Sequence, residues 1–183
     1  MMALYVLLGI AAVAVLWGVG IYNRLVKMNN LKDEAWSGMD VQLKRRFDLV
    51  PNLVETVKGY AAHEKEVFLK VTEARASIGK ASSMEERAAS ENLLSGALKS
   101  LFAVAENYPE LKANENFLHL QQELSSLEND IQMSRRYYNG AARDYNIAIE
   151  TFPAVLIARQ FGYKKAAYFE AEEEERATPK VAF

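Results

Sequence analysis

Apolar side chains recur at steps of three and four along most of this chain, which is the spacing of one face of an α-helix. The first such run comprises Leu31, Ala35, Met39, Leu43, Phe47, Val50, Val54, Val57 and Ala61. Three further runs follow, over residues 67–78, 94–105 and 117–148, and the last keeps its alternation for more than four heptads, as supercoiled helices do. No strand-like alternation interrupts them, so we predict an all-α chain.

Short polar signals separate these runs. Gly79 is placed to end the second helix in a left-handed cap. The segment 82–86 reads as a capping box for the third helix, and Asn114 is a plausible cap for the fourth. Asn107-Tyr108-Pro109 should stop the third helix, and Phe152-Pro153 the fourth. Short connections favour antiparallel neighbours, so the four helices should form an up-down-up-down bundle over residues 23–152.

The segment 3–21 is apolar throughout, and the first charged side chain is Arg24. About 20 apolar residues cross the hydrocarbon layer of a bilayer, so residues 1–22 are predicted to be a single transmembrane anchor. A cleaved signal peptide is the competing interpretation. The apolar run is too long for one, and no basic side chain precedes it. No turn signal follows, so the anchor should continue into the first bundle helix.

Lysine and arginine cluster after the anchor, at Arg24, Lys27 and Lys32. Positive charge stays on the cytoplasmic side, so we expect a single-pass protein of the bacterial cytoplasmic (inner) membrane, with the N-terminus outside and the bundle in the cytoplasm. Within the span, Ala14 and Gly18 form a small-xxx-small pair that would let two such helices pack closely. The alternative is that small residues are simply common in membrane helices.

An antiparallel arrangement fixes which residues of the first and fourth helices lie at the same height. Both helices rise about 1.5 Å per residue, so the two residue numbers should sum to about 173. Trp36 is then level with Tyr137 and Tyr138. The basic run 44–46 is level with Glu128 and Asp130. We therefore predict an aromatic layer near the membrane and an ion-pair network farther from it.

The same geometry returns the chain to the lipid surface at residues 153–183, an apolar and aromatic segment followed by an acidic tail with the run 172–175. The first part either lies in the membrane interface or folds back over the open end of the bundle. Its candidates for membrane contact are Phe152, Arg159, Phe161, Lys164 and Lys165.

Composition narrows the chemistry. The net charge is −2, which argues against a nucleic-acid partner, and the absence of cysteine excludes thiolate chemistry. His63 and His119 lack the partners of known metal motifs. We therefore predict no metal, no cofactor and no enzymatic activity. Polar and aromatic residues inside the long helices are candidates for structural pairing or for a docking surface: Trp36, Asp40, Arg45, Arg46, Asp48, Pro51, Asn52, Tyr138, Arg143, Tyr145 and Asn146. Of these, Pro51 should also kink or loosen the first helix.

Four segments in order resemble the LemA family of bacterial membrane proteins. They lie at residues 22–64, 106–124, 135–153 and 168–183, and they contain DVQLKRR, DLVPNLVETVKGYA, RDYN and TFP. The resemblance covers nearly all of the chain beyond the anchor. It implies a helical bundle on an N-terminal membrane anchor and no recognised catalytic residues, and relatives have been tied to membrane organisation.

Two functions remain. The first is a non-catalytic scaffold that self-associates as a homo-oligomer on the lipid bilayer and organises membrane or membrane-protein assemblies. The second is an adaptor or regulator that presents its bundle to another membrane protein, such as a protease or a sensor.

Overall fold

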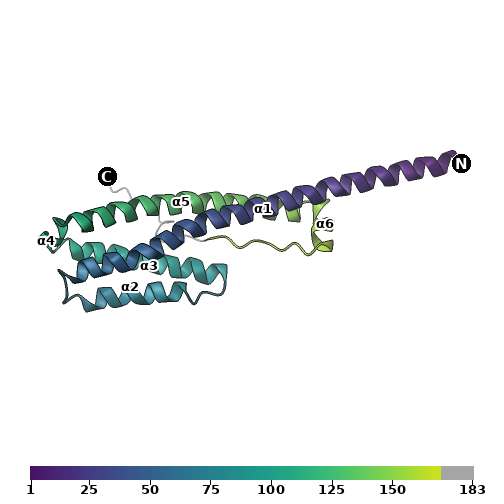
Figure 1. Cartoon of the computed structure of the whole chain (residues 1–183). Coiled ribbons are helices and arrows are strands. Elements are labelled where there is room, and N and C mark those ends of the chain that lie inside the picture. The colour runs from purple at the N-terminus through teal and green to yellow at the C-terminus, as the bar shows by residue number, and fades with distance from the viewer. Residues whose placement is uncertain (170–183) are drawn as a thin grey trace, which may run out of the picture. The chain divides into compact units, whose positions relative to one another are not determined.

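The computed structural model describes residues 1–169, and the acidic run 172–175 lies outside them (Figure 1). The helices are α1 (Met2–Lys58), α2 (Lys65–Ile78), α3 (Met84–Ala105), α4 (Pro109–Lys112), α5 (Glu115–Glu150) and α6 (Ala154–Gln160). Residues 1–169 contain no strand, so the all-α prediction is confirmed.

The predicted apolar runs are the buried faces of these helices. Every predicted core position of α5 is buried or half-buried, from Phe117 to Ala148. The run on α1 is also buried or half-buried from Ala35 onward, but Leu31 is exposed, so that one position was wrong. The 3.6-residue period thus oriented both long helices correctly, because one apolar stripe is enough to decide which side of a helix is buried.

Helix ends follow the polar signals with two corrections. Ser83 caps α3 by accepting from the Glu86 N–H at 3.1 Å, and the Asn114 side chain accepts from Phe117 N–H at 3.0 Å. Gly79 is right-handed, with φ −69°, so the predicted left-handed cap is wrong. The short α4 was missed, since one helical turn is too brief to show a period. α1 continues through Pro51 as a single helix.

The chain divides into two compact units, each containing part of α1 and part of α5. Unit 1 comprises residues 1–37 and 136–167, and unit 2 comprises 38–135 with 168 and 169. In unit 2, α1 residues from Val50 onward share a hydrophobic core with α2, α3, α4 and the start of α5. In unit 1, Leu25 of α1 packs with Tyr145 of α5 and Ala158 of α6.

In each unit the two long helices are antiparallel. In unit 2, α1 meets α5 at Arg46–Glu128, and the Asn114 amide donates to the Tyr60 hydroxyl at 3.0 Å. In unit 1, the Trp36 and Tyr138 rings lie 5.6 Å apart. The predicted register is therefore confirmed at these positions. The complete up-down-up-down four-helix bundle is not confirmed, and unit 1 contains no part of α2 or α3.

The N-terminal part of α1 is exposed from Met2 to Trp17. It forms the purple end of the helix in Figure 1, and its most apolar window is unburied. By length and composition, α1 is the one helix in residues 1–169 that is suited to cross a membrane.

Candidate functional site

Arg46 of unit 2 has a completely buried side chain. It donates to a Glu91 carboxylate oxygen at 2.7 Å and to the Glu91 carbonyl at 3.2 Å. It also donates to the Ser95 hydroxyl at 2.8 Å and to the Glu128 carboxylate. A buried charge is tolerated only when it is paired and hydrogen-bonded, so Arg46 ties α1 to both α3 and α5.

The network extends outward through Arg87. Its Nε donates to the second Glu91 oxygen at 2.8 Å, and its terminal nitrogen lies 3.3 Å from Asp40. The carboxylates of Asp40, Glu91 and Glu128 thus surround the guanidinium groups of Arg46 and Arg87. The Nε atom of Arg46 is buried without an acceptor, so even this network leaves one donor unmatched.

The predicted ion pairing of residues 44–46 with Glu128 and Asp130 is realised by Arg46 alone. Lys44 and Arg45 are exposed. Glu91, the second fully buried member, was missed. Its signal was present in the sequence: Glu91 lies three residues before Leu94, on the apolar stripe of α3, where an acid needs a buried partner.

A second group of predicted residues comes together in unit 1. Trp36 packs edge-on against Tyr138, and the Tyr138 hydroxyl donates to the Ala167 carbonyl at 2.8 Å. An aromatic pair of this kind stabilises a fold by about 0.5 to 1.5 kcal/mol beyond its burial. These two residues therefore join α1, α5 and the segment after α6.

We call residues 163–167 the strap. Asn146 binds it twice, donating to the Ala166 carbonyl at 2.9 Å and accepting from the Ala166 N–H at 2.8 Å. The Tyr145 hydroxyl donates to the Lys164 carbonyl at 2.9 Å. Burial raises the pKa of Tyr145 above its ordinary value, with smaller contributions from Tyr163 and Asp33. Three side chains of α5 thus bind backbone groups of residues 164–167, which belong to no helix.

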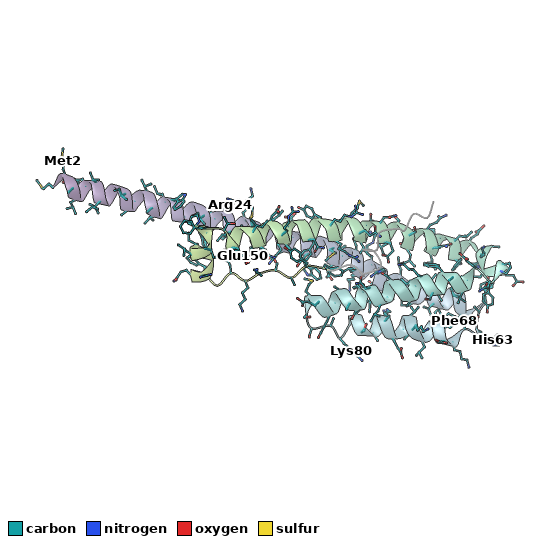
Figure 2. The ribbon with its side chains drawn as sticks, turned by 180° about the vertical axis from the view of Figure 1, so that it is seen from behind. Met2, Arg24, His63, Phe68, Lys80 and Glu150 are labelled. Carbon is teal, nitrogen blue, oxygen red and sulfur yellow. The ribbon has the colours of Figure 1, made fainter. Side chains whose placement is uncertain are left out.

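The third group lies where the apolar part of α1 ends. In Figure 2, the labels Arg24 and Glu150 mark this region beside α6, and Met2 marks the far end of the apolar part of α1. A Cβ atom at Gly18 would lie 3.9 Å from Ile157 of α6, whereas Ala14 is exposed. The Tyr22 and Phe161 rings are 4.7 Å apart. Lys165 pairs with Glu150 at 2.5 Å. The remaining membrane-contact candidates, Phe152, Arg159 and Lys164, are exposed.

The other predicted residues are not brought together. Arg143 is exposed and pairs with its neighbour Asp144 at 2.9 Å. Pro51 is half-buried within α1, and Asp48 and Asn52 are exposed on the same helix. They form no shared cluster with the three groups above.

One hollow opens between α2 and α3, with a volume of about 530 Å³. Its polar lining includes Lys70, Glu73, Ser77 and Asn92, and its rim carries the exposed Leu93. Within residues 1–169, no group of three or more histidine, cysteine, aspartate or glutamate side chains is arranged to hold a metal ion.

Comparison with known proteins gives a family match over most of the chain. The sequence model of the LemA family matches residues 35–183. The protein LemA of Metamycoplasma hominis is 31% identical over 163 residues, which cover 86% of this chain and 73% of that protein. The magnetosome protein MamQ 2 of Paramagnetospirillum magneticum is 29% identical, and the magnetosome protein MamQ of Magnetospirillum gryphiswaldense is 27% identical. Both alignments cover 81% of this chain and 64% of the relative, so the chain spans less than two thirds of the MamQ proteins.

Proposed function

The chain belongs to the LemA family, and from that premise we propose that it is a non-catalytic, membrane-anchored helical scaffold that self-associates and organises membrane or membrane-protein assemblies. The family and the MamQ relatives support a membrane-associated helical protein.

The observation that carries the proposal is the continuity of α1. The helix runs unbroken from Met2 to Lys58, and its first fully buried residue, Leu25, comes within one turn of Tyr22. No loop separates the apolar segment from the folded residues of unit 1. An anchor joined in this way transmits its position directly to the folded part, which suits a protein that places other components at a membrane.

The use of the polar residues supports the absence of catalysis. Arg46, Tyr138, Tyr145 and Asn146 direct their hydrogen-bonding groups at other parts of the fold. A catalytic group must instead reach a substrate.

The proposal includes an orientation and an architecture. Residues 1–22 form the single span, residues 23–152 an up-down-up-down four-helix bundle, and residues 153–183 a membrane-proximal segment and acidic tail. The cations Arg24, Lys27 and Lys32 support an orientation with the bundle in the cytoplasm and the N-terminus outside the bacterial inner membrane.

Self-association is tested best at Ala14. Ala14 is exposed, whereas a larger residue at Gly18 would also push against Ile157. We expect the detergent-solubilised protein to be a large, homogeneous homo-oligomer by light scattering coupled to size exclusion. Ala14→Leu should lower its mass, because close approach of two spans needs small residues.

Ala12→Leu is the matched control, since Ala12 lies on nearly the opposite face of the same exposed segment. An unchanged mass in Ala14→Leu would remove the span from the self-association surface. A strictly monomeric wild-type protein would overturn the scaffold.

The second candidate is an adaptor or regulator that presents the bundle to a membrane protease or sensor. The hollow between α2 and α3, with Leu69 and Leu93 exposed on these helices, favours it as a surface for a partner. Crosslinking in intact cells with a photoreactive residue at Leu93 distinguishes the two functions, because the adaptor predicts a heterologous product and the scaffold a product between copies of this chain.

A further inference from the structure

α6 packs on α1 at the point where the apolar segment gives way to charged residues. Ile157 approaches Gly18, Phe161 packs on Tyr22, and Ala158 is buried against the group that contains Leu25. The next cation on α1 is Arg24, two residues beyond Tyr22. If the apolar segment spans a bilayer, this is the height of the lipid–water interface.

Large apolar side chains on α6 and at its two ends remain exposed to a great extent, even where one of them also contacts α1. Phe152 is 76% exposed, Leu156 59% and Phe161 61%. Phe152 precedes α6 by two residues, Leu156 lies in its first turn, and Phe161 follows its last residue. Leaving three large side chains exposed forgoes the stabilisation that their burial would supply, about 1.5 to 3 kcal/mol for each one fully buried. At the level of the lipid–water interface, these side chains can be buried by insertion into the lipid.

Cations surround these apolar side chains. Arg159 and Lys164 are exposed, and Lys165 is held by Glu150. Large apolar side chains flanked by lysine and arginine are the pattern of an element lying in the interface, with the aliphatic stems reaching out of the apolar layer and the charges among the headgroups.

The strap keeps α6 in this position. Tyr138, Tyr145 and Asn146 bind the backbone of residues 164–167 directly after α6, and Phe152-Pro153 connects α6 to the end of α5. α6 is therefore tethered to α5 on both sides. The sequence suggested either that the segment 153–169 lies in the membrane interface or that it folds back over the helices. The strap does the second, since it is bound along α5, and α6 is available for the first.

We propose that α6 is a second membrane contact, lying in the plane of the lipid surface and inserting Phe152, Leu156 and Phe161 into it. This inference rests on the proposed membrane anchoring. A span crosses the bilayer but leaves rotation about its own axis free, whereas a span with an attached interfacial element has one preferred rotation and depth. α6 thus fixes which side of the folded part of unit 1 faces the membrane.

The absence of cysteine allows a direct test with single nitroxide labels. The full-length protein would be reconstituted in vesicles of phosphatidylcholine and phosphatidylglycerol, labelled at Leu156→Cys, Leu93→Cys or Leu8→Cys. All three leucines are similarly exposed, at 59%, 61% and 58%, so the labels differ in location rather than in packing. Collision of each label with oxygen, which concentrates in lipid, is compared with collision with a water-soluble nickel chelate.

We expect the ratio of oxygen to nickel collisions to be several-fold higher at positions 8 and 156 than at position 93. A label at position 156 that matches position 93 would overturn the contact. If position 8 is in lipid and position 156 in water, only the α6 inference fails. If position 8 is in water, the anchor fails, and position 156 still decides the α6 contact by itself. Phe152→Cys repeats the measurement should Leu156→Cys lose its helical circular dichroism.

Discussion

Arg46 of α1 and Glu91 of α3 are both completely buried and form an ion pair at 2.7 Å. Arg46 also reaches Glu128 of α5, and Glu91 is shared with Arg87. The four charges join three helices within one unit. Such a pair adds little net stability over an apolar substitute, but its geometry is demanding, so it favours one arrangement of the helices over sliding alternatives.

Removing only one partner of this pair should be costly. Arg46→Met or Glu91→Leu is expected to lower the free energy of unfolding by about 3 to 5 kcal/mol, because each leaves a buried charge without its main partner. The double variant should lose less than the sum of the two, since neither buried charge then remains. Urea unfolding followed by circular dichroism measures all three, and additive losses would contradict the coupling. Arg143→Met, at an exposed arginine, should change the value by no more than about 0.5 kcal/mol.

The strap should loosen when Asn146 is truncated. Asn146→Ala removes both hydrogen bonds to Ala166, and we expect the local free energy of opening to fall by about 1 to 3 kcal/mol. Hydrogen exchange at the Ala166 amide, read by mass spectrometry, should speed up accordingly. Asn129→Ala is the control, because the Asn129 amide bonds only to the Ser125 carbonyl on an exposed part of the same helix. If the Ala166 amide exchanges equally slowly in Asn146→Ala and in wild type, Asn146 does not hold the strap in place.

Acid should weaken the start of α3 through Glu86. Hydrogen bonds from the Ser82 N–H and hydroxyl hold the pKa of Glu86 below its ordinary value of 4.5. A lowered folded-state pKa contributes stability that is present above 4.5 and is lost as the pH falls through the folded value. Glu86→Gln should therefore flatten the decline of the melting temperature below about pH 4.5. Glu85→Gln, which removes the same charge one residue earlier, should leave that slope in place.

The cations beside α6 should set its response to lipid charge. Arg159→Gln together with Lys164→Gln is expected to weaken interfacial binding to anionic vesicles by about 1 kcal/mol per charge, while binding to neutral vesicles stays the same. A nitroxide at Leu156→Cys reports the depth in both lipids. Lys165→Gln should have a smaller effect, because Lys165 is already paired with Glu150. Equal depth in anionic lipid with and without the two cations would refute an electrostatic contribution.

Local order was readable from the sequence because it depends on local chemistry. The apolar period identified the buried faces of α1 and α5, and the side chains of Ser83 and Asn114 marked true helix starts. The failures have local causes as well. Gly79 tolerates a left-handed conformation without requiring one, and α4 is too short for a period to appear.

The pairing of α1 with α5 was also predictable. Antiparallel helices with equal rise per residue have partners whose numbers sum to a constant. Trp36 with Tyr138 in unit 1 and Arg46 with Glu128 in unit 2 follow that rule.

The partners of α3 and of the strap were decided only by the tertiary structure. Which acid reaches Arg46 from α3 depends on how α3 is rotated and translated against α1, and Glu91 achieves this through packing rather than through any spacing in the sequence. The strap is bound through its backbone carbonyls and one N–H, groups that nearly every residue possesses. A side-chain pattern reveals which face of a helix is apolar. It does not reveal where a segment such as the strap, which is bound through its backbone, will pack.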